Sequence, residues 1–408
     1  MNIAEHPQKK YYLSLLGFIV FSTIAMNYTF RQITLVWWGS LVLLFVLLLL
    51  DNRGSLYLQL NTYFIWYACF VMICALSALF AVSISVCITK LKTLIILGIA
   101  LIAVCQITLK QRTIRFVLFG YLISSLINAV YVLLTIDLTL LGDLRLGTDI
   151  LEGWNANGIA FMLSSGALIS FYLFKNSFSK KKIEQVFYAI AFFFCSVLTI
   201  FTGSRTGVFT ILVGIIVYTL LLHPKRVLKN LLIVALIIVG AFALIMEVPM
   251  LYNVFGIRLE GFFSLFSDVE NADSSALLRE TYIKNGWKWF AESPFLGRGI
   301  NNYQLLNETA TGRLTYAHNN LIELAVDLGI VGVLVYYSYY VLLFAELIKL
   351  IKKEKTACFL LATLIAYTAA QYGTVSYDYW FMNLLLLLSL LYVWLPHDQD
   401  ISISNAAF

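Results

Sequence analysis

The sequence predicts an all-α polytopic membrane protein with about twelve membrane-spanning helices and one large outward-facing loop. Three observations predict this fold class. Of the 408 residues, 61% are hydrophobic and 12% are charged, whereas a soluble domain has roughly one quarter charged residues. Apolar runs of about 17 to 25 residues recur along the chain, each long enough to cross a hydrocarbon core as a helix. One connection, 248–318, is far longer than the others.

The apolar runs between charged breaks set the predicted spans. The first run follows the segment MNIAEHPQKK and lacks a small-residue cleavage site, so we expect a retained helix rather than a removed signal peptide. The predicted spans are 11–29, 33–50, 62–88, 92–109, 116–140, 157–174, 186–203, 206–222, 231–247, 320–346, 357–373 and 378–395.

The basic residues orient these spans. With the N-terminus inside, most of the 28 lysines and arginines fall in cytoplasmic segments such as KNSFSKKK, HPKR and LIKLIKKEK, as the positive-inside rule requires. Lys90 and Lys92 fit poorly, because spans at 62–88 and 92–109 leave them on the outer side. We therefore expect a multi-pass inner-membrane protein with both termini in the cytoplasm.

Span and loop lengths divide the chain into three parts. Residues 1–247 are expected to form an N-terminal transmembrane bundle of about nine helices, 248–318 a large periplasmic loop with amphipathic helices, and 319–408 the C-terminal transmembrane helices and a short cytoplasmic tail. In the loop, SALLRETYIKNGWKWFAESP mixes aromatic residues with charges in a helical pattern that ends at Pro294. This helix is expected on the membrane surface or over the mouth of a cavity.

Neither the cysteines nor the loop acids predict a metal site. The six cysteines lie in or beside hydrophobic runs without CxxC spacing or neighbouring histidines, which is typical of small core residues. The acids of SDVENAD would suit a divalent ion, but a charged, mobile loop is the favoured interpretation. These acids are Asp268, Glu270 and Asp273.

His318 alone among the four histidines is expected to face outward. It stands in TYAHNNLIELAVDLGIVG, where the long loop re-enters the membrane, with Asn319 and Asn320 placed to cap the next helix. The residue type allows two roles. His318 is either an interface or capping residue, or a proton acceptor for a hydroxyl at a protected membrane boundary.

Two arginines suit an anion on the same side. Arg205 lies in TGSRTG, the tight outward turn between two spans, where a guanidinium either extends to water and lipid phosphate or grips a ligand phosphate through two parallel hydrogen bonds. Arg279, on the amphipathic helix of the loop, either lies on a solvated helix face or joins Arg205.

Acids, amides and rings surround these positions. Glu323 and Asp327 are four residues apart and share a helix face in the outer leaflet, where they need a polar cavity or partners. Outward aromatic and amide residues are typical both of sugar sites and of a membrane interface belt. Whether Glu323 orients His318 stays open. The expected substrate-binding residues are Glu323, Asn319, Asn157, Tyr303 and Arg298.

Taken together, the arrangement resembles the O-antigen ligase and polymerase superfamily of bacterial envelope glycosyltransferases. The matching pieces are the arginine of TGSRTG, the AHNNLIELAVDLGIVG helix, and a loop pattern between them that runs Arg279, Trp287, Pro294, Gly297, Gly299. The resemblance covers mainly residues 200–345.

The resemblance implies a site and a substrate. Two periplasmic arginines and a histidine are functional in that superfamily, and by motif position they fall on Arg205, Arg279 and His318. It also implies a multi-helix GT-C type fold and a glycan donor carried on undecaprenyl diphosphate. Two arginines would stabilise the diphosphate leaving group without a metal or other cofactor, and His318 would take the proton of an attacking sugar hydroxyl, with inversion at the anomeric carbon.

The acceptor separates two activities. A polymerase joins one lipid-linked repeat unit to another, whereas a ligase moves the finished glycan onto the lipid A core. Some ligases have a second histidine two residues before the catalytic one and an acid two after it. Tyr316 and Asn320 stand there in this chain, which favours a polymerase of O-antigen or related surface polysaccharide.

A lower alternative is a transporter or flippase for a lipid-linked glycan, although such proteins usually show repeated halves and helices broken at the midplane. Besides the donor, the acceptor and membrane lipids, the expected partners are a chain-length regulator or a flippase. No nucleic acid is expected.

Overall fold

The computed structural model describes residues 61–107, 111–137, 145, 146, 155–177, 181–264 and 274–394, together with the single helical positions 39, 42 and 46. Within these ranges every regular element is a helix, which confirms the predicted all-α class. The predicted span 11–29 and the acids of SDVENAD lie outside the described residues, as does the predicted span 33–50 apart from positions 39, 42 and 46.

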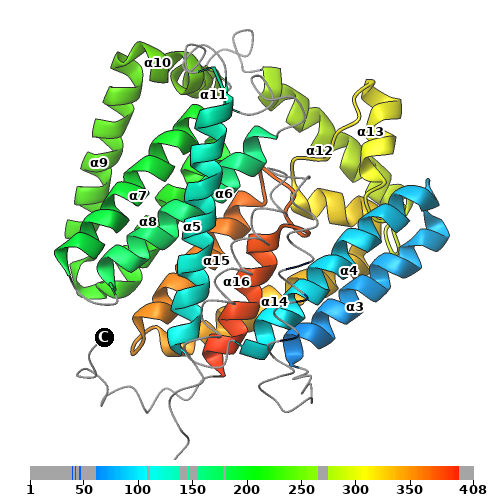
Figure 1. Ribbon diagram of the computed structural model, residues 1–408. Coiled ribbons are helices and arrows are strands. Elements are labelled where there is room, and N and C mark those ends of the chain that lie inside the picture. The colour runs from blue at the N-terminus through cyan, green and yellow to red at the C-terminus, as the bar shows by residue number, and fades with distance from the viewer. Residues whose placement is uncertain are drawn as a thin grey trace, which may run out of the picture.

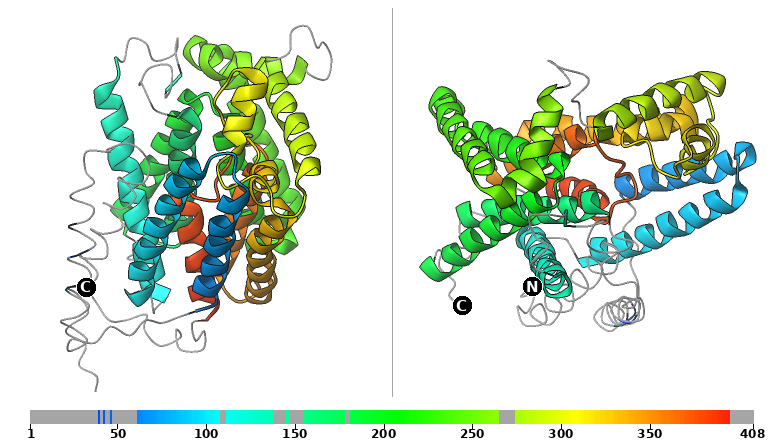
Figure 2. Two further views of the ribbon diagram at one scale, coloured as in Figure 1. Left: turned by 90° about the vertical axis from the view of Figure 1, so that its right-hand side faces the viewer. Right: turned by 90° about the horizontal axis from the view of Figure 1, so that it is seen from above.

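The first half of the described chain contains six long helices. α6 packs against α5, α7 and α8, while α3 packs beside α4. Seen from above, α7 and α8 lie on the side opposite the α3–α4 pair (Figure 2). The elements are α3 (Thr62–Ser77), the 3₁₀ turn η2 (Ala78–Phe80), α4 (Ile84–Ile107), α5 (Gln111–Thr135), α6 (Ala156–Lys175), α7 (Lys182–Phe201) and α8 (Arg205–Leu222).

The middle of the chain gathers at one end of the bundle. α10 to α13 lie at the upper end in Figure 1, and the end of α16 lies at the lower end. The chain bends by 98° between the end of α9 and the helix that follows it, as expected of a broken span or a re-entrant segment. The elements are η4 (Pro224–Arg226), α9 (Val227–Glu247), α10 (Pro249–Leu251), the π-turn η5 (Tyr252–Gly256), α11 (Ile257–Ser264), α12 (Ser274–Glu292) and α13 (Tyr303–Thr311).

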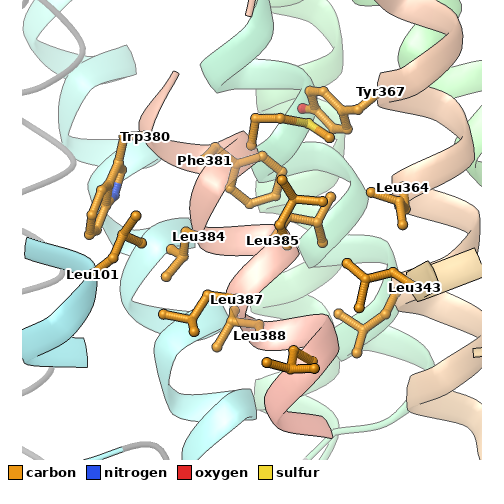
Figure 3. Close-up of a cluster of buried hydrophobic side chains, with 14 of the residues drawn as sticks. Leu101, Leu343, Leu364, Tyr367, Trp380, Phe381, Leu384, Leu385, Leu387 and Leu388 are labelled. Atoms are coloured by element: carbon orange, nitrogen blue, oxygen red, sulfur yellow. The ribbon is translucent and has the colours of Figure 1, made fainter. Parts of the chain in front are cut away.

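Three C-terminal helices form the centre: α14 (Asn320–Leu350), α15 (Lys355–Ala370) and α16 (Trp380–Val393). Figure 3 shows leucine side chains of α16 packed against side chains of α4, α14 and α15. Because lipid tails are as apolar as leucine, close packing of these side chains stabilises the core of the bundle. The largest apolar cluster of the described residues contains side chains of all three helices.

Seven of the described helices are long and apolar enough to cross a membrane, or eight if the bent pair counts as one span. α15 and α16 are apolar but shorter. Each predicted span from residue 62 onward has a helix near it, so the chain is a multi-pass membrane protein, while the total of twelve spans stays a prediction.

One predicted boundary is wrong. The predicted spans 62–88 and 92–109 end and begin at charged residues, but η2 ends at Phe80 and α4 begins at Ile84. Lys90 and Lys92 therefore lie inside α4. The charge of Lys90 is tolerated there because its ammonium meets the carboxylate of Asp378 at 2.7 Å.

A second departure is the break in α14 at Gly329, which has φ 66° and ψ −169°, a region that is essentially restricted to glycine. The loop after α12 packs into this break. A Cβ on Gly329 would lie 2.3 Å from the backbone of Phe295, and one on Gly297 would lie 2.4 Å from the backbone of Asp327. These glycines therefore let two backbones touch.

The contact at the break predicts a difference between two glycines. Gly329→Ala should lower the melting temperature in detergent strongly, because it combines a forbidden conformation with an overpacking cost of about 1–3 kcal/mol. Gly312 is the matched control. It has φ 70° and nothing within 4 Å of an added Cβ. Gly312→Ala should therefore cost only the left-handed strain of about 1–2 kcal/mol. Equal losses of stability would contradict the packing argument.

Candidate active site

His318 lies in the segment between α13 and α14. Its backbone has φ 53°, a left-handed conformation that few non-glycine residues adopt. Its imidazole contacts two tyrosine rings. The ring centroid of Tyr316 is 4.1 Å away, and that of Tyr282 on α12 is 6.1 Å away and nearly parallel. The backbone and both rings together fix the orientation of the imidazole.

The surroundings of His318 keep it neutral. Burial, and after it the positive charge of Arg279, lower the pKa of His318 from 6.5 to about 3. The imidazole therefore has a lone pair for a proton at pH 7. Its Nδ1 atom is buried and makes no hydrogen bond to any residue that the structure describes. Buried polar atoms without a partner are rare and call for a functional explanation.

Arg279 lies on α12, one turn before Tyr282. α12 packs closely on α14, because a Cβ on Gly286 would lie only 2.3 Å from the side chain of Ile322. This close packing brings Tyr282 against His318 and the charge of Arg279 near it. The predicted amphipathic helix therefore exists as α12, and it covers the start of α14.

Arg205 is the first residue of α8. The hydroxyl of Ser204 caps this helix by accepting the N–H of Gly207. The Nη1 atom of Arg205 donates to the carbonyl of Arg258 in α11, at 3.3 Å. The bend after α9 thus brings α11 over the turn that carries Arg205.

A third arginine holds the same turn. The Nε atom of Arg145 donates to the carbonyl of Thr202 at 3.1 Å. Gly203 has φ 63°, and a Cβ there would lie 3.0 Å from that Nε atom. Arg145 was not among the predicted site residues, because nothing in its neighbourhood in the sequence links it to TGSRTG.

Asn157 connects the Arg205 turn with His318. Its Oδ1 atom accepts the hydroxyl of Ser204 at 2.9 Å, and its Nδ2 atom donates to the hydroxyl of Tyr316 at 3.3 Å. Asn155, the cap of α6, also donates to Tyr316 at 3.3 Å. Tyr316 then contacts the imidazole. The starts of α6 and α8 and the segment before α14 are therefore joined by hydrogen bonds beside His318.

Glu323 and Asn319 hold the segment on both sides of His318. The carboxylate of Glu323 is 1% exposed and accepts the N–H of Ala317 at 2.7 Å. The side chain of Asn319 caps α14 by accepting the N–H of Ile322, as predicted. Asn320 does not cap the helix. It lies inside α14, and its Oδ1 atom instead accepts N–H groups of the α15–α16 connection.

Asp327 receives the loop after α12. Its carboxylate accepts the N–H of Asn301 at 2.5 Å and that of Tyr303 at 2.8 Å. Tyr303 is fully buried, and its hydroxyl donates to the carbonyl of Tyr282 at 2.7 Å. Arg298 pairs with Glu292 at 3.0 Å at the edge of this loop. Tyr303 therefore supports Tyr282, while the guanidinium of Arg298 is half exposed.

The tyrosines at His318 were not among the predicted site residues. Tyr282 was noted only as part of an amphipathic pattern, and Tyr316 only as the residue that replaces a second histidine. Aromatic residues are common throughout this chain, so no signal in the sequence separates these two rings from the others. No group of three metal-binding side chains occurs among the described residues, and Asp268, Glu270 and Asp273 lie outside them.

The lowered pKa of His318 predicts a pH effect on stability. The unfolded chain protonates this imidazole near pH 6.5 and the folded chain only near 3, so stability is complete above about pH 6.5 and falls as the pH drops towards 3. At pH 5 the loss is about 1–2 kcal/mol.

The melting temperature in detergent at pH 7 and pH 5 tests this prediction. His318→Gln removes the titrating group and should therefore show a smaller fall than the wild type. Equal falls in the two proteins would mean that His318 is not held neutral by the fold.

The comparisons with known proteins follow this geometry. A family model described as O-antigen ligase matches residues 190–337, which run from α7 into α14. The matched range contains Arg205, Arg279 and His318. No curated protein matches the chain.

Proposed function

Because residues 190–337 place the chain in the O-antigen ligase and polymerase superfamily, we propose that it is a membrane glycosyltransferase that polymerises lipid-linked glycan repeat units. The proposed site faces the periplasm from the bacterial inner membrane, with both termini in the cytoplasm and a GT-C-like fold. The observation that carries the proposal is the neutral His318 beside Arg279, joined to the Arg205 turn through Tyr316 and Asn157.

The donor in this proposal is a glycan on undecaprenyl diphosphate. As the bond between the anomeric carbon and the diphosphate oxygen breaks, its electron pair goes to the diphosphate. Arg205 and Arg279 are proposed to stabilise that charge, because fixed guanidinium groups in a water-poor site need no reorganisation as charge develops. This role requires no metal ion.

His318 is proposed as the general base. An acceptor hydroxyl attacks the anomeric carbon from the side opposite the diphosphate, forms the new glycosidic bond and passes its proton to the imidazole. Inversion follows from this direction of attack. A pKa of about 3 makes a weak base; burial is the larger cause of that low value and the charge of Arg279 the smaller one. A diphosphate bound at Arg279 would offset its charge and raise the pKa of His318 when the donor is in place.

The acceptor is proposed to be the sugar of a second lipid-linked repeat unit. Tyr316 stands where some ligases have a second histidine. Here its hydroxyl accepts hydrogen bonds from the side-chain amides of Asn157 in α6 and of Asn155, the N-cap of α6. Asn320 stands where those ligases have an acid, and it binds the α15–α16 connection. Neither residue is the histidine or the acid of those ligases, which favours the polymerase over the ligase.

Deletion of the gene tests the acceptor. A polymerase mutant should leave single-repeat glycans on the lipid A core, visible as one short band on a lipopolysaccharide gel. Loss of all glycan from the core, with long chains accumulating on the carrier, would establish a ligase instead. Normal glycans in the deletion strain, together with a transport defect that the His318→Ala and Arg205→Ala variants still correct, would favour a transporter or flippase.

Arginine substitutions test the leaving-group role. Arg205→Gln and Arg279→Gln should each lower the transfer rate of the purified protein about 100-fold or more, the usual effect of removing one preorganised charge-stabilising donor. Arg313→Gln is the matched control, because Arg313 is an exposed arginine of the segment between α13 and α14 that also contains His318. Its rate should stay near that of the wild type, and chelator should not change any of these rates. Strict dependence on a divalent ion would contradict the proposed mechanism.

A further inference from the structure

We infer that Glu323 and Asp327 are positioning residues that hold His318 in its working orientation from two sides. The inference rests on the proposed function in one respect: the working orientation is the one in which His318 accepts the proton. The contacts that hold His318 are observed independently of that role. It concerns two buried acids that the proposed reaction does not use as acid or base.

The backbone strain points to these acids. Among the described residues, two non-glycine residues have positive φ, Asn301 and His318. Such conformations persist only where the surroundings force them. In each case an α14 carboxylate accepts an N–H at or next to the strained residue. Glu323 accepts that of Ala317, and Asp327 accepts those of Asn301 and Tyr303.

Glu323 acts on His318 through the backbone. Its Oε2 atom accepts the N–H of Ala317 at 2.7 Å, and Asn319 begins α14 directly after His318. Because Ala317 and Asn319 are both held by these contacts, the backbone of His318 between them adopts a φ of 53°. The carboxylate thus sets the direction of the imidazole without touching it.

Asp327 acts on the imidazole through the ring of Tyr282. It fixes the N–H of Tyr303 at the start of α13, and the hydroxyl of Tyr303 donates to the carbonyl of Tyr282. The ring of Tyr282 then stacks on His318. Because Glu323 and Asp327 are one turn apart on α14, one rigid helix segment fixes both the loop of His318 and the ring that covers it.

The experiment measures the position of His318 directly. The full-length purified protein is treated with diethyl pyrocarbonate, and mass spectrometry gives the rate of modification at His318 relative to His223, which is exposed at the end of α8. Glu323→Ala should raise this ratio about tenfold or more, the population shift expected when a charged hydrogen bond is lost. Glu323→Gln should stay near the wild type, because its amide oxygen still accepts the N–H of Ala317.

Asp327→Ala should raise the ratio in the same way, whereas Asp327→Asn should recover only part of the loss, because its single amide oxygen can accept only one of the N–H groups of Asn301 and Tyr303. Glu308→Ala, at an exposed acid of α13, is the control and should leave the ratio unchanged. In glycosyl transfer, Glu323→Ala should lower kcat about 100-fold with a smaller change in KM, as a misplaced catalytic group does, and Glu323→Gln should recover most of that loss.

Two outcomes would overturn the inference. If Glu323→Gln were as inactive as Glu323→Ala while His318 kept its wild-type modification rate, Glu323 would be a chemical participant rather than a positioning residue. If Glu323→Ala left the modification rate unchanged, it would not hold the loop. Failure of the proposed function is distinct: transfer would then be insensitive to His318→Ala, while the modification rates would still report the positions.

Discussion

The segment between α12 and α13 depends on hydrogen bonds that its N–H groups donate to α14. The carbonyl groups of Val326 and Asp327 bind the N–H groups of Arg298 and Gly299 at 2.8 and 2.9 Å. The side chain of Asp327 adds two further N–H groups of the same loop. A buried N–H without a partner costs about 1–3 kcal/mol, so loop and helix are stable only together. The break at Gly329 is what opens these carbonyl groups to another chain segment.

Buried charges mark the same level of the bundle. Glu323 and Asp327 are at most 1% exposed, and each accepts hydrogen bonds from backbone N–H groups. Lys90 and Asp378 form an ion pair nearby in the fold, with the ammonium also 5.4 Å from the ring centre of Tyr377. Carboxylates and ammonium groups are costly in a hydrophobic protein unless hydrogen bonds or partners offset the loss of hydration. Each of these four residues therefore has an ion pair or a hydrogen bond that offsets the cost of burying its charge.

Sequence reasoning succeeded where one local signal is strong. Hydrophobic runs predict the helices from α6 to α9 well, since their ends coincide with short polar turns, and the pattern before Pro294 predicts α12. It failed at Lys90, because a charge inside a helix looks like a helix end until its partner is known to be nearly three hundred residues away. The motif positions of Arg279 and His318 predicted two neighbours, and in the structure the charge of Arg279 acts on His318, while their catalytic roles stay a prediction.

The rest of the site was not predictable from the sequence. The tyrosines that enclose His318 come from α12 and from the segment before α14, and the arginine over Gly203 comes from a distant loop. Such contacts depend on how helices pack, and an aromatic residue in a chain with 24 tyrosines gives no sign of its partner. The role of Glu323 was left open because five residues on a helix do not align two side chains, and its contact proves to be with the backbone of Ala317.

The caps of α6, α8 and α14 have an electrical consequence. Asn155, Ser204 and Asn319 begin three helices whose first turns meet through Asn157 and Tyr316. The aligned peptide dipoles of a helix give its first turn a partial positive charge of roughly half a unit. Three such ends around one place create a positive potential that belongs to the main chain and does not titrate. Loss of an arginine side chain therefore removes only part of the attraction that this end of the bundle exerts on an anion.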